Sequence, residues 1–217
     1  MLILGTAELR LTTPLEIVSV LSLLALLPAA MASLTPFLRI TLVLHFLRQA
    51  LGTQTAPSNP VLLGLALFLT MLVMQPLAGE LQTKALHPYT KNELTLVQAL
   101  EAAHDPLHKF LLRFAREKDI QLFLELTKTP APRRPQDVEL RVLMPAYVLS
   151  ELRTGFQIGA VLFLPFLIID LVVASVTLSI GMVQLPPVMI AAPFKILLFV
   201  LVDGWNLVIG SLMRSFN

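Results

Sequence analysis

Three ionisable side chains stand alone in the most apolar part of this sequence. Asp170 lies within FLIIDLVVAS, Lys195 within APFKILLFV, and Asp203 within VLVDGWNLV. Placing one charge at the centre of an apolar helix in a bilayer costs about 2.5–3.5 kcal/mol on insertion scales. A passive membrane anchor would not carry three of them, so the sequence predicts protein partners for these charges.

The spacing of the charges favours structural pairs over a proton or ion relay. Lys195 and Asp203 are eight residues apart, which is about 12 Å along a straight helix, so they cannot pair directly. A relay needs more titratable groups at depth than this region offers. Glu151, in the run SELRTGF, is the predicted partner of Lys195, in the same or a neighbouring copy. The alternative for Glu151 and Arg153 is an ordinary helix end at an interface.

No recognisable catalytic motif accompanies these charges. The sequence has no G-x-S-x-G motif, no P-loop and no Cys, which excludes disulfides and thiolate metal sites. His104 and His108 have the i, i+4 spacing of a metal pair, but Asp105-Pro106 is expected to break the helix between them, and a third ligand is missing. We interpret them as surface histidines and predict no enzymatic activity, cofactor or metal.

The composition is that of a membrane protein with one polar insert. Of 217 residues, 56% are hydrophobic and 14% are charged, and the mean hydropathy is +0.78, whereas a soluble domain has about 25% charged residues. The net charge of +2 is too small to indicate nucleic-acid binding. Nineteen of the thirty Asp, Glu, Lys and Arg residues lie between Glu80 and Arg141. The predicted organisation is an apolar region (1–79), a polar helical insert (80–140) and a second apolar region (141–217).

The N-terminal region predicts three apolar helices. Ile17–Leu34 contains Ala30-Met31-Ala32, which resembles a signal-peptidase site, but no basic segment precedes it, so we interpret it as a retained helix. Phe37–Leu51 is predicted to be an amphipathic helix with Arg39 away from its apolar stripe. Val61–Leu77 is uncharged and just long enough to span a membrane.

The insert predicts three short helices. Thr90-Lys91-Asn92-Glu93 matches a capping box that would open a helix ending near Ala103. Asp105 before Pro106 predicts the start of a second helix, and Asp119 is expected to cap a third. Thr129–Asp137 is a proline-rich linker.

The C-terminal region predicts an apolar helical hairpin, so the whole chain is expected to be all-α. Phe156–Ile180 is one helix kinked at Pro165, Gly181–Pro187 is a turn, and Val188–Phe216 is the return helix. Gly155 and Gly159 form a G-x-x-x-G pair that allows a second helix to approach closely. Prolines interrupt most of the apolar runs, which favours helices packed in an assembly over independent spans.

Several long motifs resemble one family. They are MPAYVLSELRTGFQIG (Met144–Gly159), PFLIIDLVVAS (Pro165–Ser175), PFKILLFVLVDGW (Pro193–Trp205) and LRQALGTQTAPSNPVLLGLALFLT (Leu47–Thr70). Together they are similar to the FliP/SctR family of export-gate proteins, found in bacterial flagella and type III secretion injectisomes. The resemblance covers essentially the whole chain. Within it, the hairpin sequence with Gln157 resembles the flagellar members of the family more than the injectisome members.

The resemblance implies a ring of several copies, five by family expectation, built with FliQ-type and FliR-type proteins. Such a ring is the entry pore for unfolded exported flagellar subunits and adjoins FlhA-type and FlhB-type proteins. It implies a helical ring in contact with lipid of the bacterial inner membrane, at the flagellar basal body, with its insert and much of the gate on the periplasmic side. The alternatives are an injectisome gate subunit and, from the broken helices and buried charges, a channel or secondary-transporter subunit.

The resemblance also assigns roles to particular residues. The family's methionine-rich pore gasket corresponds to the loop Gly181, Met182, Val183, Gln184 and Leu185, in which only the first of the usual methionines is kept. The family's buried acid–lysine pair corresponds to Glu151 and Lys195, and Asp170 to its intramembrane aspartate.

Overall fold

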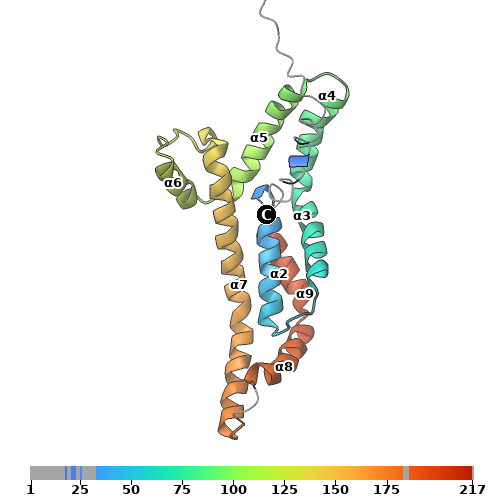
Figure 1. The fold of residues 1–217 in the computed structure, drawn as a ribbon, viewed down its shortest axis with the longest axis vertical. Coiled ribbons are helices and arrows are strands. Elements are labelled where there is room, and N and C mark those ends of the chain that lie inside the picture. Colours follow the sequence, from blue (N-terminus) through green and yellow to red (C-terminus); the bar gives the residue numbers. More distant parts are fainter. Residues whose placement is uncertain (1–17, 19–20, 23–24, 26–32, 183–185, 217) are drawn as a thin grey trace, which may run out of the picture.

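The computed structural model describes residues 18, 21–22, 25, 33–182 and 186–216, and within these ranges it contains helices and no strand (Figure 1). The all-α prediction is therefore confirmed, while most of the predicted helix Ile17–Leu34 lies outside the described residues. The elements in chain order are α2 (Phe37–Ala50), α3 (Asn59–Leu81), a π-helical turn η1 (Gln82–Leu86), α4 (His87–Thr90), α5 (Leu96–Phe114), α6 (Glu117–Leu126), a 3-10 turn η2 (Pro135–Asp137), α7 (Leu140–Ser179), α8 (Pro187–Leu201) and α9 (Gly204–Arg214).

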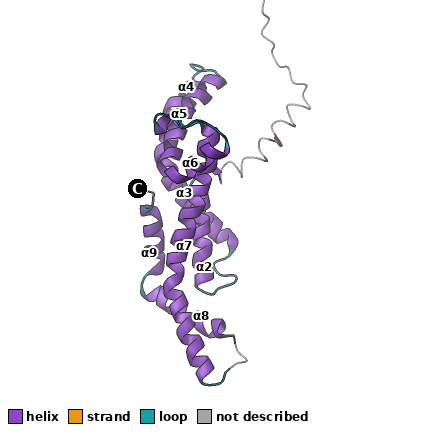
Figure 2. Cartoon of the chain, turned by 90° about the vertical axis from the view of Figure 1, so that its left-hand side faces the viewer, coloured by secondary structure: helices purple, strands orange, loops and turns teal. Residues whose placement is uncertain are grey.

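The helix α7 is the spine of the molecule. It has 40 residues and so extends about 60 Å at 1.5 Å per residue. Its N-terminal part meets α5 and α6, its middle packs along α2, and its C-terminal part meets α8. Figure 2 shows the resulting elongated shape, with α6 toward one end and α8 toward the other.

Two apolar clusters hold the helices together. The larger joins α2, α3, α7, α8 and α9 around Ile40, Val43, Leu44, Leu47, Leu62, Ala66, Phe166, Phe199, Val208, Leu212 and Phe216. The smaller joins α5, α6 and the start of α7 around Leu111, Ile120, Leu124, Val142, Leu143, Ala146 and Tyr147. The helices of the insert are therefore anchored on the same spine as the apolar helices.

The G-x-x-x-G pair of α7 lies against α2. A Cβ atom added to Gly155 would lie 2.8 Å from Cδ2 of Leu42, and one added to Gly159 would lie 2.3 Å from Cδ2 of Phe46. Both distances are far below van der Waals contact. The absence of side chains at these positions is what allows α2 to lie so close to the spine.

The insert contains fewer breaks than the sequence predicts. The capping box that opens α5 is formed by Thr95 and Gln98 and not by Thr90-Lys91-Asn92-Glu93. Asp105-Pro106 does not interrupt α5, because Pro106 removes only one backbone donor and its buried ring packs within the helix bundle. Asp119 is the third residue of α6 and is buried there, and the N-cap position is occupied by Arg116.

The prediction of a single return helix in the C-terminal hairpin is wrong. The single helix expected at Val188–Phe216 is broken into α8 and α9, which meet at 68°. Asp203 adopts a left-handed conformation (φ 52°, ψ 53°) that ends α8. By contrast, α7 runs without interruption through Pro145 and Pro165.

Two helical segments of the described chain are long and apolar enough to cross a membrane. They are the continuous run Asn59–Thr90 and α7. The bent pair of α8 and α9 would make a third if the two helices count as one span. This assignment rests on length and composition.

Replacing Gly159 by Ala is expected to destabilise the protein, because the new methyl group would collide with the Phe46 ring. Overpacking of this kind costs about 1–3 kcal/mol. The matched control is Gly64→Ala in α3, where nothing lies within 4 Å of an added Cβ and the change gains helix propensity. Thermal unfolding in detergent checks the prediction; equal midpoints for the two variants would contradict it.

Candidate functional site

The best-buried ion pair joins Arg39 of α2 to Glu151 of α7. The guanidinium binds the carboxylate through two N–H groups: Nε donates to Oε2 at 3.0 Å, and Nη2 donates to Oε1. The side chains are 3% and 0% exposed. A buried bidentate pair of this kind is both strong and geometrically selective, so it fixes the register of α2 on α7.

The same guanidinium also holds the end of the chain. Arg39 Nη1 donates to the backbone oxygen and to Oγ of Ser215, both at 3.1 Å. The Phe216 ring lies under the guanidinium, 4.1 Å from Cζ to the ring centroid, and the Phe114 ring of α5 lies 5.8 Å from it. Arg39, itself part of α2, therefore contacts α5, α7 and the residues that follow α9.

The second pair of the apolar region joins Lys195 of α8 to Asp170 of α7, with 2.6 Å between Nζ and Oδ2. The predicted partner of Lys195 was Glu151, and the structure corrects this within the chain. Glu151 and Asp170 are nineteen residues apart on one continuous helix, which separates them by about 28 Å. Lys195 therefore pairs with Asp170 in the C-terminal half of α7, while Glu151, nearer the N-terminus of the same helix, pairs with Arg39.

Asp203 is not part of either pair. It is exposed at the break between α8 and α9, and its Oδ2 accepts a hydrogen bond from Asn206 Nδ2 at 3.2 Å. The break carries Asp203 out of the apolar helix, and an ionic partner for it in an assembly stays a prediction. Lys195 pairs with Asp170 and not with Asp203, as the eight-residue separation predicts.

Arg39 lies away from the apolar stripe formed by Leu42 and Phe46, as predicted, but the face that carries it is also buried, so α2 is not the amphipathic helix that the sequence predicts. The residues four and eight positions later are Val43 and Leu47, which lie on the same side of a helix and are buried. This spacing could have identified Arg39 as a buried charge. The more prominent apolar stripe, Leu42 and Phe46, marks the neighbouring face of α2, which packs on Gly155 and Gly159 of α7.

Sequence reasoning also missed a polar contact between the insert and the spine. The Arg116 backbone N–H donates to Oγ of Ser150 at 2.9 Å, and that hydroxyl donates to Oδ2 of Asp119 at 2.7 Å. Arg153 lies 3.2 Å from Oδ1 of Asp119. Ser150 is adjacent to Glu151, so one turn of α7 binds α6 through Ser150 and α2 through Glu151.

The histidine pair does not form a metal site. His108 is buried, and its Nε2 lies 2.6 Å from the carbonyl oxygen of Val138, to which it donates. The exposed His104 ring stacks on it at 5.8 Å between centroids. Within the described residues, no cluster of His, Asp or Glu could hold a metal ion. The interpretation as surface histidines is therefore wrong for His108, which ties α5 to the segment before α7.

The loop predicted to be a gasket is only partly described. Gly181 ends α7 with φ 77°, a conformation that favours glycine, and Met182 is partly exposed beside it. Val183, Gln184 and Leu185 lie outside the described residues. The described residues Gly181 and Met182 follow the end of α7 at one end of the molecule (Figure 1).

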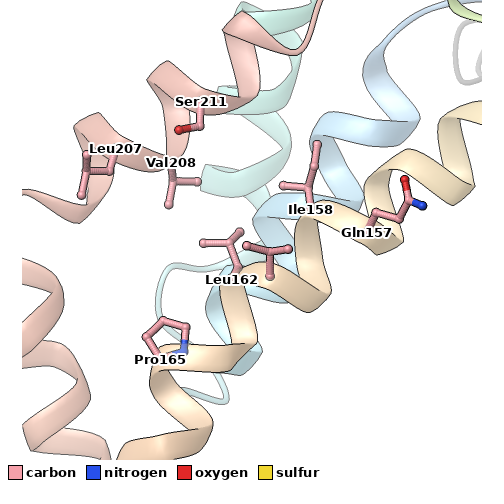
Figure 3. Close-up of a pocket in the computed structure, with 8 residues that line it drawn as sticks. Gln157, Ile158, Leu162, Pro165, Leu207, Val208 and Ser211 are labelled. Atoms are coloured by element: carbon pink, nitrogen blue, oxygen red, sulfur yellow. The ribbon is translucent and has the colours of Figure 1, made fainter.

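The remaining surface of the hairpin is apolar and grooved. A groove of about 460 Å³ runs between α7 and α9, and Gln157 and Ser211 are its only polar lining residues (Figure 3). A second groove, of about 510 Å³, lies between α7 and α8 around Val172, Val176 and Phe194. Large apolar side chains that are more than half exposed continue from these grooves along α7 and α8: Val161, Leu164, Leu167, Ile168, Leu171, Val172, Val176, Val188, Met189, Phe194, Leu197, Val200 and Leu201. Such surfaces bind other helices or lipid.

Comparison with known proteins identifies the family. The model of the FliP family matches residues 20–212. The chain belongs to the FliP family. Its relatives named flagellar biosynthetic protein FliP include one from Pectobacterium carotovorum subsp. carotovorum, which is 49% identical over 94% of this chain and 80% of the relative. Another, from Bacillus subtilis (strain 168), is 46% identical over 94% of this chain and 93% of its own length. A third, from Aquifex aeolicus (strain VF5), is 40% identical over 99% and 90%.

In this FliP-family chain, Arg39→Ala is expected to destabilise the fold by about 3–5 kcal/mol, because Glu151 would be left as an unpaired buried charge. Arg39→Met combined with Glu151→Leu removes both charges and is expected to recover most of the loss. Unfolding of the purified chain in detergent gives both values.

The control for this prediction is Lys84→Ala, which breaks an exposed i, i+4 pair with Glu80 and should change stability by no more than about 0.5 kcal/mol. If Arg39→Ala were as mild as this control, the buried pair would not hold α2 on α7.

Proposed function

We propose that this FliP-family chain is a core subunit of the flagellar type III protein export gate. Several copies, five by analogy with the family, form a ring with FliQ-type and FliR-type proteins. The ring is the entry pore for unfolded flagellar subunits in the inner membrane, next to FlhA-type and FlhB-type proteins. Its role is structural and involves no catalysis.

The observation that carries this proposal is the family match over residues 20–212, together with the flagellar names of the relatives. These names favour the flagellar role over the injectisome alternative. The apolar faces of α7 and α8 give physical support, because a chain with this much uncovered apolar surface is an incomplete unit that needs lipid or further helices.

The Lys195–Asp170 pair supports a packed assembly over independent spans. Lys195 is 3% exposed, whereas Asp170 is 31% exposed. The other carboxylate oxygen of Asp170, Oδ1, is buried and has no hydrogen-bond partner within the described residues. Because the Asp170 side chain as a whole is partly exposed, a turn of the carboxylate would present this oxygen to a donor from a neighbouring subunit. By analogy with the family, the loop Gly181–Leu185, which follows α7 in the sequence, would line the constriction of the pore as its gasket.

The direct test is assembly with the proposed partners. Co-expression with the FliQ-type and FliR-type proteins of the same genome, followed by mass measurement and imaging in detergent, is expected to give one closed complex with several copies of this chain. A monomer that binds neither partner would overturn the proposal. Ion flux through the isolated chain would support the transporter alternative instead.

The test in cells is complementation. Expression of the chain with its FliQ-type and FliR-type partners in Bacillus subtilis lacking the corresponding proteins is expected to restore hook-subunit export and swimming. Export of injectisome substrates without flagellar subunits would indicate the alternative gate.

Lys195→Ala is expected to abolish assembly and export, because it leaves Asp170 without a counter-charge in the apolar hairpin. The loss of stability should lie near the lower end of about 3–5 kcal/mol, since Asp170 is partly exposed. Asp170→Asn combined with Lys195→Met should restore part of the complex. Arg141→Ala, which breaks an exposed pair with Glu139, is the matched control. Wild-type export and ring formation by Lys195→Ala would refute the role of the pair.

A further inference from the structure

The bend between α8 and α9 is concentrated in two residues. Asp203 has φ 52° and ψ 53°, a left-handed conformation that is uncommon outside glycine and that Asp adopts more readily than most residues. The next residue, Gly204, lies under the Phe199 ring, where an added Cβ would be 2.1 Å from Cδ2. Both flanking helices keep their regular form up to this point, so the break has the geometry of a hinge.

The helix beyond the hinge is held on one side only. The inner face of α9 packs into the larger apolar cluster through Leu212, with Ile209 and Met213 packed against the cluster, and Val208 both belongs to the cluster and lines the groove toward α7. Its other side faces the groove that separates it from α7, where Leu207 is 54% exposed (Figure 3). This eleven-residue helix is therefore held by apolar packing along one face and by the contacts at its far end.

Those end contacts converge on Arg39. Nη1 of the guanidinium binds Ser215, and the Phe216 ring stacks beneath it. Phe216 is itself buried, with its ring edge-on to Phe114 at 5.8 Å. Nε and Nη2 are engaged separately with Glu151. The contact with Ser215 and Phe216 can therefore be lost while the Arg39–Glu151 pair remains.

We propose that α9 is a separately movable element, with Asp203–Gly204 as its hinge and the Arg39 contact with Ser215 and Phe216 as the latch. Released from the latch, α9 turns about Asp203 and opens the groove along α7. If Asp203 returned to a right-handed conformation, Pro187–Arg214 would form one rod of about 42 Å. This inference concerns the chain itself and does not depend on the proposed function.

The absence of Cys from the sequence makes site-directed spin labelling a clean test. Val161→Cys on α7 and Leu207→Cys on α9 label two exposed positions (67% and 54%) on either side of the groove. Pulsed electron paramagnetic resonance on the full chain in detergent should give one narrow short distance. Phe216→Ala, and a chain ending at Arg214, should raise the ratio of long to short distances on the order of tenfold.

Two variants and two further measurements make the result specific. Phe216→Tyr keeps an aromatic ring on the guanidinium and should retain the short distance. Phe194→Ala removes an exposed ring of α8 and should also retain the short distance.

The single Trp of the chain, Trp205, lies at the start of α9, edge-on to Phe199 at 5.4 Å, so its fluorescence should change when α9 is released from Arg39. A label pair at Gln49 and Val161 should keep its distance, because it reports on α2 and α7.

An unchanged α7–α9 distance in Phe216→Ala and in the shortened chain would overturn the proposal. So would an equal broadening of the α2–α7 distance, because Phe216 would then support the whole fold and not the position of α9.

Discussion

The Arg39 guanidinium of α2 contacts α5, α7 and the residues that follow α9, so it links four parts of the chain. Burying this charge is tolerable only because its N–H groups are shared between a carboxylate on α7 and the residues that follow α9, and because aromatic rings cover its faces. Each of these contacts constrains a different element. The pair with Glu151 sets the register of α2 on the spine, and the contact with Ser215 and Phe216 brings the end of the chain back to the middle of the molecule.

The close approach of α2 and α7 depends on a second, steric constraint. Gly155 and Gly159 leave room for Leu42 and Phe46, and the ion pair could not form if the helices were held further apart. One turn of α7 then receives the insert as well, because Ser150 faces Asp119 of α6 while Glu151 faces α2. The insert and the apolar helices are thus coupled through adjacent residues of one helix.

Away from this centre, the chain exposes a large apolar surface. The C-terminal half of α7 and most of α8 expose large aliphatic side chains, and the only charges within them, Asp170 and Lys195, neutralise each other. Removing one member of such a pair leaves an uncompensated charge among apolar side chains, which is strongly destabilising. This arrangement supports a subunit whose apolar surfaces are completed by lipid and neighbouring chains.

The sequence by itself determined the all-α class, the apolar and polar regions, the family, and the requirement that the buried charges have partners. These properties follow from composition, periodicity and long local motifs, which need no knowledge of distant contacts. Tertiary structure alone decided which charges pair: α7 continues through two prolines and so carries Glu151 about 28 Å away from Asp170. It likewise decided that Pro106 leaves α5 intact, that His108 is buried, and that α8 and α9 separate at Asp203. Each of these outcomes depends on residues far apart in the sequence, such as Phe199 against Gly204 at the break or Val138 against His108, whose packing outweighs local helix preference.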